Sequence, residues 1–314
     1  MSKTLLLMIL IAFLIVINFL FIFNSDDSGD SPLSNAAGLN KNVFSASQAY
    51  VFLLAESNYM PLLNSGFARP IINAKSAVLY DLRAERALYE NNTKQKLPVA
   101  SLTKILSAVI ALENLDLADI VIIPQEALRV DEEKQTLYLD ERLTVENLLK
   151  LMLIESSNDS AKALALYAGE KGIDFTAKMN EKAFALGMVD SFFLDTAGLN
   201  DEAYSTVEDL VKLVKYALKF ELIWDILAKK NVIIKSEDGQ IEHQVKNTNH
   251  LFGVLPDIFG GKTGYTDGAL GCMILVVDIP GENDKIISVV LGSSDRFGDT
   301  AKLINWAKAA WRWE

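Results

Sequence analysis

Three apolar segments near the C-terminus are joined by connections too short for a parallel crossover. They read FGGKTGYT (259–266), ALGCMILVVDI (269–279) and KIISVVLGS (285–293), and a turn-rich segment, 280–284, separates the last two. A parallel crossover takes a dozen residues or more, so these segments are expected to pair as antiparallel strands. The last third of the chain therefore predicts the centre of an antiparallel sheet.

A second strand region lies earlier in the chain, and helical segments follow it. Residues 76–92 read as two short strands around a polar turn. Residues 101–115 repeat apolar side chains at helical spacing on most sides, and Ser101 stands at the N-cap position. Capping residues mark further helices, which are expected at 144–154, from Asn158, from Asp174, and from a capping box of Ser205 with Glu208.

The order of the expected elements defines the fold class. Strands are followed by helices, then by strands again, and a final helix is expected at about 300–313. Asp238-Gly239 marks a hairpin before the C-terminal strands. This order is typical of the α+β class. We therefore expect one mostly antiparallel sheet, built from both ends of the chain and flanked by helices.

The N-terminus carries a long apolar run. Residues 5–23 are apolar except for Asn18, and these 19 residues suffice to cross a bilayer core of about 30 Å as a helix. Lys3 precedes the run and aspartates follow it, which places the rest of the chain on the extracytoplasmic side of a cell membrane. A cleavable signal peptide is the alternative, but its apolar stretch would be shorter and small residues would follow closely.

The same reading divides the chain into three parts. We expect an N-terminal membrane anchor or signal peptide over 1–24, a flexible linker over 25–43, and a single folded domain over 44–314. The linker assignment rests on a polar composition rich in Gly, Ser and Asp, which cannot bury enough surface to fold.

Composition excludes several kinds of function. The formal charge of -11 disfavours a surface that binds nucleic acid, because such surfaces need clustered Lys and Arg. The single cysteine, Cys272, allows no intramolecular disulfide, and two histidines are too few for a typical structural zinc site. We expect no metal and no cofactor, and any nucleophilic serine is expected to use a base other than imidazole.

The first polar motif, Ser101-Leu102-Thr103-Lys104, sets a hydroxyl and an amine three residues apart. On a helix they share one face and can approach each other. An N-cap serine followed by a solvated lysine is the alternative interpretation. The apolar surroundings favour a functional pair, because a lysine in such a helix must be desolvated or paired.

Two further polar motifs follow. Ser156 and Asn158 lie in a turn between two expected helices, where capping of the second helix explains them equally well. The third motif, GGKTGYT (260–266), contains Lys262 and Thr263 and leads into a strand. It lacks the spacing of a phosphate-binding loop, and that loop leads into a helix.

The patterns S-x-x-K, S-x-N and K-T-G occur once each and in this order. In this respect the chain resembles the D-alanyl-D-alanine carboxypeptidase and endopeptidase family among the penicillin-binding proteins. The resemblance extends over roughly residues 70 to 310. It includes the segments LPVASLTKILSA, ESSNDSA and GGKTGYTDGA, the run from 195–199 to Ser205-Thr206, and Asn247-Thr248-Asn249, to which no role is assigned. It implies a helical subdomain beside a mostly antiparallel, helix-covered sheet, as in β-lactamases, with the active site between them.

The resemblance also implies a role for each catalytic residue. Ser101 would be the nucleophile that forms an acyl-enzyme, and Lys104 the general base, with a pKa depressed below about 10.4 by burial and a nearby cation. Ser156 would relay a proton to the leaving amine. The backbone N–H groups of Ser101 and Tyr265 would form the oxyanion hole.

The substrate-binding residues follow in the same way. Asn158 would bind the peptide amide of the substrate, Lys262 and Thr263 would hold its terminal carboxylate, and Gly264 and Tyr265 would complete the binding strand. The implied substrate is a peptidoglycan stem pentapeptide that loses its terminal D-alanine, and β-lactams would inhibit covalently. Many family members have His where Tyr265 stands, which bears on substrate preference.

Several alternatives stay open or are disfavoured. A D,D-endopeptidase that cleaves peptidoglycan cross-links would use the same residues, and an inactive peptidoglycan-binding module would not need to retain all the polar groups. A class A β-lactamase would need Glu and Asn at E-x-x-x-N spacing, which is absent between Asn158 and Lys262. A class C enzyme or related esterase would carry Tyr-x-Asn at 156–158.

Overall fold

The computed structural model describes residues 60–130, 135–279 and 284–313. The predicted anchor (1–24) and linker (25–43) lie outside these ranges, as does the start of the predicted folded domain. Among the helices of the described ranges, none has the length and apolar character that a bilayer crossing requires.

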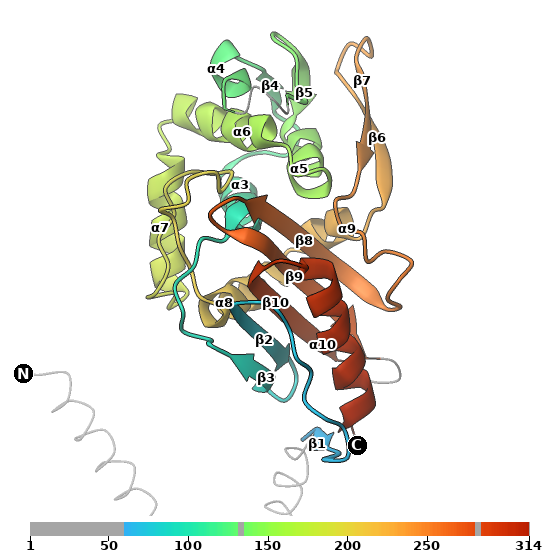
Figure 1. Ribbon diagram of the computed structural model, residues 1–314. Coiled ribbons are helices and arrows are strands. Elements are labelled where there is room, and N and C mark those ends of the chain that lie inside the picture. Colours follow the sequence, from blue (N-terminus) through green and yellow to red (C-terminus); the bar gives the residue numbers. More distant parts are fainter. Residues whose placement is uncertain (1–59, 131–134, 280–283, 314) are drawn as a thin grey trace, which may run out of the picture. The chain divides into compact units, whose positions relative to one another are not determined.

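The centre of the fold is a five-stranded antiparallel sheet (Figure 1). Its strand order is β3-β2-β10-β9-β8, so an N-terminal hairpin lies directly beside the last long strand. The predicted sheet built from both ends of the chain is therefore confirmed. The strands are β2 (Ser76–Asp81), β3 (Arg86–Asn91), β8 (Ile258–Thr266), β9 (Leu270–Asp278) and β10 (Lys285–Ser293).

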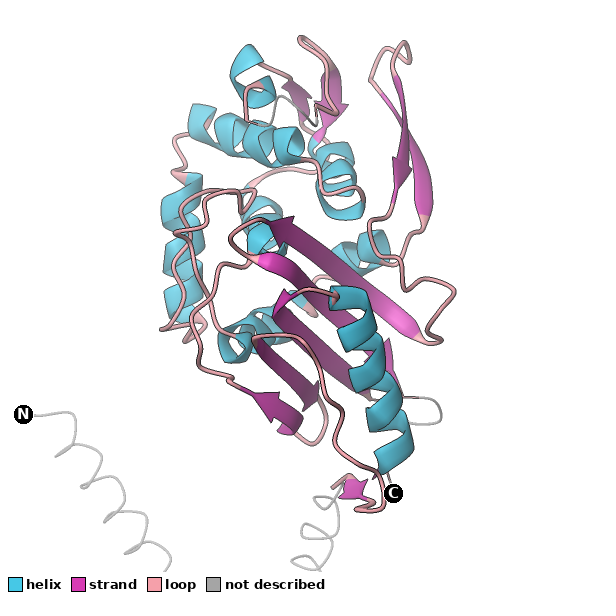
Figure 2. Cartoon of the chain, viewed as in Figure 1, coloured by secondary structure: helices cyan, strands magenta, loops and turns pink. Residues whose placement is uncertain are grey.

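The two faces of this sheet are covered by different helices. Helix α10 (Arg296–Ala310) packs on β9 and β10, whereas α8 (Val207–Ala217) packs on β10 and β2 from the other side (Figure 2). Successive strand residues point to opposite faces, so Leu79 joins the core under α10 and Val78 joins the core of the other face. Burial on both faces explains why β9 and β10 read as continuous apolar runs.

The middle of the chain forms a helical region around α3 (Thr103–Asn114), which is buried along most of its length and contacts α5, α6, α7 and α8. Three predicted starts are confirmed: Thr144 and Asp174 each accept a backbone N–H as the N-cap of a helix, and α6 begins at Asn158 with Ser157 as its N-cap. The other helices of this region are α4 (Gln125–Leu128), α5 (Val145–Ile154), α6 (Asn158–Glu170), α7 (Phe175–Ala185) and α9 (Glu221–Leu227).

Two predicted helix caps are wrong. Ser101 lies inside a short 3-10 turn, η1 (Ala100–Leu102), and Leu102 occupies the N-cap position of α3 without a side-chain hydrogen bond. Helix α8 is capped by Thr206, whose hydroxyl accepts the Asp209 N–H at 3.1 Å.

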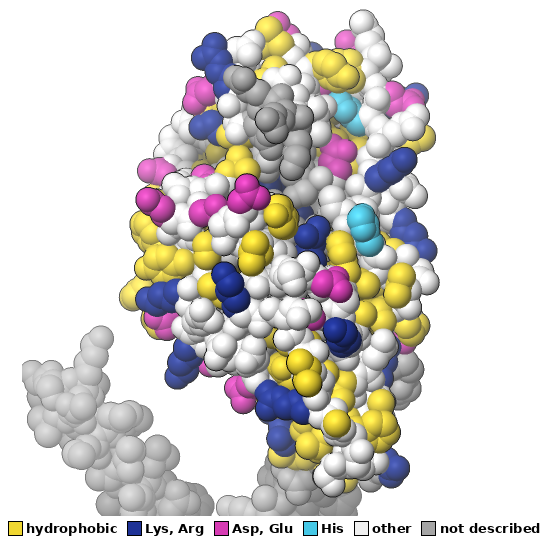
Figure 3. All heavy atoms as spheres, in the orientation of Figure 1, with side chains coloured by type: hydrophobic (Ala, Val, Ile, Leu, Met, Phe, Trp, Pro, Cys, Tyr) yellow, Lys and Arg dark blue, Asp and Glu magenta, His cyan; other side chains and the backbone are white. Residues whose placement is uncertain are grey.

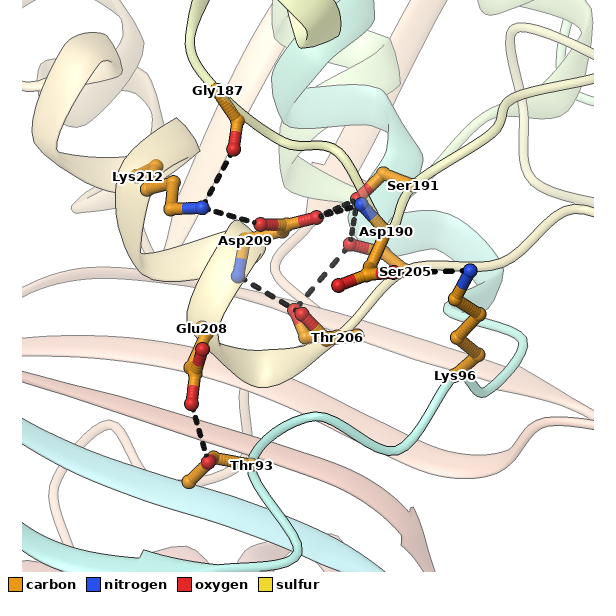
Figure 4. A network of polar contacts seen from close by, with 10 residues as sticks. All are labelled: Thr93, Lys96, Gly187, Asp190, Ser191, Ser205, Thr206, Glu208, Asp209 and Lys212. Atoms are coloured by element: carbon orange, nitrogen blue, oxygen red, sulfur yellow. Dashed lines mark hydrogen bonds and ion pairs between the residues drawn. The ribbon is translucent and has the colours of Figure 1, made fainter.

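The expected capping box at α8 fails because its two side chains have other partners (Figure 4). The Ser205 hydroxyl lies 2.7 Å from the Ser191 hydroxyl, and the Glu208 carboxylate accepts a bond from Thr93. With the cap at Thr206, Glu208 comes one position too early to reach back to it. Together these contacts fasten the loop before α8 to the rest of the fold.

The shorter strands form three pairs, and one of them corrects the predicted last helix. Helix α10 begins at Arg296 and ends at Ala310, because Trp311 pairs with Leu63 in a two-residue strand. The predicted hairpin at Asp238-Gly239 is confirmed. The pairs are β1 (Leu62–Leu63) with β11 (Trp311–Arg312), β4 (Ile120–Ile122) with β5 (Arg142–Thr144), and β6 (Asn231–Lys235) with β7 (Glu242–Lys246).

Acidic and basic side chains of the described residues are interspersed on the face that Figure 3 shows. No field of one sign covers that face, as a nucleic-acid surface would require.

Candidate active site

Ser101 lies in a turn that the neighbouring strand approaches closely. The preceding residue, Ala100, has a left-handed φ of 48°, which is strained for a side chain with a Cβ. Strand β8 packs on this turn, and a Cβ at Gly264 would lie only 3.0 Å from the Ser101 backbone nitrogen. Glycine at this position of the K-T-G motif thus lets the strand lie directly against the turn that carries the serine.

Lys104 is fully buried one helical turn after Ser101, at 0% exposure. Its Nζ lies 2.8 Å from Ser101 Oγ, 2.7 Å from Asn158 Oδ1 and 2.7 Å from the Ala197 carbonyl oxygen. The alternative of a solvated lysine is therefore wrong. An amine in this position is desolvated, and the surrounding oxygens compensate for that loss.

Ser156 faces a second buried lysine. Ser156 has a φ of 70° in the turn between α5 and α6, and its hydroxyl accepts a hydrogen bond from Lys262 Nζ at 2.9 Å. Lys262, on β8, also donates to the Thr263 carbonyl at 2.9 Å and is only 1% exposed. Burial, reinforced by the positive charges of Lys104 and Arg296, holds the Lys262 pKa well below its ordinary value.

These groups surround a cleft of about 290 Å³ between the helical region and β8. Six of the residues predicted from sequence line it, whereas Lys104 and Lys262 lie behind its wall. Tyr265 stands at the rim with 57% of its surface exposed. The lining residues are Ser101, Glu155, Ser156, Asn158, Leu199, Thr248, Thr263, Gly264, Tyr265 and Arg296.

Four of the lining residues were missed by the sequence reading. Thr248 lies 2.6 Å, hydroxyl to hydroxyl, from Thr263, and it belongs to an Asn-Thr-Asn segment that carried no assigned role. Arg296 begins α10, far along the chain from the motifs, and its guanidinium carbon lies 4.7 Å from the Phe297 ring centroid. Burial lowers the pKa of this guanidinium. Leu199 belongs to the loop after α7.

Glu155 is the fourth missed residue, and its place directly before Ser156 was the available signal. One of its carboxylate oxygens, Oε1, is buried and has no hydrogen-bond partner among the described residues. Burial raises the pKa of this carboxyl group. The cleft lining thus includes a partly buried acid, Glu155, and the Arg296 guanidinium, while the buried amines of Lys104 and Lys262 lie behind its wall.

Neither histidine lines the cleft, so neither is placed to act on Ser101. His243 Nε2 lies 2.6 Å from Glu141 Oε1, and His250 stacks on Phe297 at 4.8 Å between ring centroids. The Cys272 thiol is buried in β9, and burial raises its pKa to about 11. Within the described ranges, no group of three or more His, Cys, Asp or Glu side chains is arranged to hold a metal.

The geometry is suited to acyl transfer. A hydroxyl lies within hydrogen-bond reach of a buried amine, which is the arrangement of a nucleophile with its general base. Ser101 and the β8 residues Thr263, Gly264 and Tyr265 line the same cleft, and the Lys262 amine lies behind its wall, 2.9 Å from Ser156 Oγ. The class of chemistry that this site supports is attack of a serine on a carbonyl carbon.

The chain matches a known protein family over most of its length. Residues 64–295 match the family described as D-alanyl-D-alanine carboxypeptidase. This match covers well over half of the chain and includes Lys104, Lys262 and every residue that lines the cleft except Arg296. The chain belongs to the D-alanyl-D-alanine carboxypeptidase family, as the sequence motifs predicted.

Two relatives show how far the similarity extends. The D-alanyl-D-alanine carboxypeptidase DacF of Bacillus subtilis is 32% identical over 243 residues, which are 74% of this chain and 62% of the relative. The D-alanyl-D-alanine endopeptidase of Haemophilus influenzae is 36% identical over 197 residues, which are 61% of this chain and 66% of the relative. The chain thus spans just under two thirds of the length of these relatives.

A solved structure confirms the fold class. The structure of a penicillin-binding protein of Listeria monocytogenes in its ampicillin-bound form superposes with a TM-score of 0.65 at 29% identity. The superposition covers 76% of this chain and 99% of that one. The predicted penicillin-binding protein fold, a mostly antiparallel sheet with flanking helices and a helical subdomain, is therefore confirmed.

Proposed function

We propose that this protein is a serine-type D-alanyl-D-alanine carboxypeptidase that removes the terminal D-alanine from peptidoglycan stem pentapeptides. One observation carries the proposal: Ser101 Oγ lies 2.8 Å from the Nζ of fully buried Lys104, at the edge of a cleft bordered by the K-T-G strand. The family match and the names of the relatives, carboxypeptidase and endopeptidase, support the substrate class.

In the proposed reaction Lys104 takes the hydroxyl proton while Ser101 Oγ forms a bond to the carbonyl carbon of the scissile peptide. The carbonyl electron pair moves onto oxygen, where the backbone N–H groups of Ser101 and Tyr265 stabilise it. Ser156 then relays this proton from Lys104 to the departing nitrogen and keeps its own hydroxyl, the C–N bond breaks, and D-alanine leaves. Water attacks the remaining ester to release the shortened peptide and restore the serine.

The other predicted site residues hold the substrate in this proposal. Lys262 and Thr263 bind the terminal carboxylate, and Arg296 adds a positive charge at the cleft. Asn158 keeps its Oδ1 on Lys104 and, because it lines the cleft, also contacts the peptide amide. Gly264 keeps β8 close enough for the substrate to lie against the strand.

The test is covalent labelling by a fluorescent penicillin, because a strained β-lactam presents a carbonyl and a carboxylate much as D-Ala-D-Ala does. We expect a single adduct at Ser101, none in Ser101→Ala, and acylation slowed about 100-fold to 10,000-fold in Lys104→Ala. The exposed-residue variants Ser65→Ala and Lys178→Ala serve as controls and should label normally. An adduct on another serine would contradict the mechanism.

The substrate preference needs a separate measurement. The purified protein is incubated with a stem pentapeptide and, in parallel, with cross-linked muropeptides, and the products are followed by mass spectrometry. Release of free D-alanine from the pentapeptide supports the carboxypeptidase. New uncross-linked monomers without D-alanine release would instead favour the endopeptidase, which the Haemophilus relative represents. An inactive binding module would yield neither product.

We also propose that residues 1–24 anchor the protein in the cell membrane with the catalytic domain on the extracytoplasmic side. The apolar run 5–23 and its charge flanks support this arrangement. Peptidoglycan lies outside the cytoplasmic membrane, so the proposed substrate requires the same location.

A further inference from the structure

The carboxylate of Asp195 organises a tight turn beside the catalytic pair. Its Oδ1 accepts the backbone N–H groups of Ala197 at 2.7 Å, of Gly198, and of Leu199 at 3.3 Å. Its Oδ2 accepts the N–H of Asn200 at 2.8 Å. One side chain thus satisfies four consecutive backbone donors, and the conformation of residues 195–200 depends on it.

The inner side of this turn touches both halves of the Ser101/Lys104 pair. The Ala197 carbonyl accepts from Lys104 Nζ at 2.7 Å. Gly198, with φ 77°, packs so tightly on the residue before Ser101 that a Cβ there would lie 1.9 Å from the Ala100 carbonyl oxygen. The turn is therefore in direct contact with the lysine amine and with the backbone that carries the serine.

The oxygen atoms around Lys104 Nζ determine the direction in which the lone pair of the neutral amine points. A neutral amine has two hydrogens to donate and one lone pair to accept with. The Ala197 carbonyl and Asn158 Oδ1 are oxygens that only accept, so they can take both hydrogens. The lone pair is then left for the Ser101 hydroxyl, which is the orientation that a general base needs.

We propose that Asp195 is a positioning residue for the general base. By closing the turn it holds the Ala197 carbonyl against Lys104, so that the neutral amine presents its lone pair to the Ser101 hydroxyl. This inference rests on the proposed function. As Ser101 attacks the substrate carbonyl, its proton moves to Lys104, and the resulting ammonium keeps its bonds to the Ala197 and Asn158 oxygens until the proton passes to the leaving nitrogen.

The experiment measures the rate constant of Ser101 acylation by a fluorescent penicillin as a function of pH in the full-length chain. In Asp195→Ala we expect the plateau rate to fall by about 100-fold, as for a misplaced catalytic group. In Asp195→Asn, which keeps one acceptor oxygen, we expect an intermediate rate. Asp174→Ala is the matched control, because Asp174 also accepts a backbone N–H but at the start of α7, away from Lys104.

The pH profile separates positioning from a general loss of structure. The Ala197 carbonyl bonds an ammonium more strongly than a neutral amine, so a loosened carbonyl should shift the rising limb of acylation to lower pH in Asp195→Ala. A merely destabilised enzyme would lose plateau rate in proportion to its unfolded fraction, which circular dichroism measures, and its rising limb would stay in place. That result, or a wild-type rate in Asp195→Ala, would overturn the proposal.

The same acylation measurements distinguish a failure of the proposed function from a failure of the proposed role of Asp195. If the unmodified protein is not acylated at Ser101 at all, the proposed function fails. If it is acylated and the Asp195 variants acylate with its rate and pH profile, only the role of Asp195 fails.

Discussion

The folded structure disfavours the protonated, charged form of Lys262. It is 1% exposed, and burial together with Lys104 and Arg296 lowers its pKa well below the ordinary value of 10.5. In the window between the folded pKa and 10.5, the unfolded chain binds a proton that the folded chain does not. The contribution of Lys262 to the free energy of unfolding therefore rises with pH across this window.

A direct prediction follows for Lys262→Met. Removing the amine while keeping a similar volume should raise the free energy of unfolding by about 1 kcal/mol at neutral pH, and the gain should shrink as pH approaches 10.5. Binding of a β-lactam carboxylate should weaken at the same time. Denaturant unfolding at a series of pH values measures the first effect, with exposed Lys178→Met as control. Lower stability in Lys262→Met at neutral pH would contradict this account.

At the scale of elements, the turn at 195–200 leaves no room for a side chain at Gly198. Gly198 and Gly187 both have left-handed φ values, 77° and 73°, but their surroundings differ. A Cβ at Gly187 would meet nothing within 4 Å, whereas a Cβ at Gly198 would collide with the Ala100 carbonyl. Alanine variants of Gly187 and Gly198 therefore distinguish the effect of backbone strain from the effect of displacing the turn beside the catalytic pair.

We predict different outcomes for the two alanine variants. Gly187→Ala should lose about 1 kcal/mol of stability from its left-handed backbone and keep its acylation rate. Gly198→Ala should lose about 3 kcal/mol or more, and its folded fraction should acylate slowly, because the Ala100–Ser101 backbone must move. Thermal unfolding and penicillin labelling measure both quantities. If the two variants lose the same stability and acylate at the same rate, the close packing at Gly198 does not contribute to catalysis.

At the scale of the whole molecule, the apolar N-terminal run predicts how the protein is attached to the membrane. We predict that the full-length protein fractionates with membranes, that a variant lacking residues 2–24 does not, and that protease added outside the cell digests the catalytic domain. Protection of that domain on the cytoplasmic side would remove the proposed location. A soluble mature protein that lacks the apolar run at 5–23 would instead favour a cleaved signal peptide.

The sequence by itself determined the features that depend on neighbours along the chain. Apolar segments with short connections identified the strands of the sheet, helical spacing identified α3, and capping residues identified α5 and α6. The proximity of Ser101 and Lys104 could be predicted because three residues on a helical turn bring two side chains to one face. Local geometry also explains why the predicted start of α8 was wrong by only one residue: Ser205 and Thr206 can both cap a helix, and Ser191 and Thr93 decide between them.

Only the tertiary structure decided which distant groups meet at the cleft. Lys262 reaches Ser156 across 106 positions of sequence, Thr248 meets Thr263, and Arg296 arrives from the start of α10. These contacts depend on the sheet order and on the approach of the turn between α5 and α6 to β8, which no local pattern encodes. The Ala197 carbonyl was beyond prediction for a further reason: every residue has a carbonyl, so only the folded backbone shows which one faces the Lys104 amine.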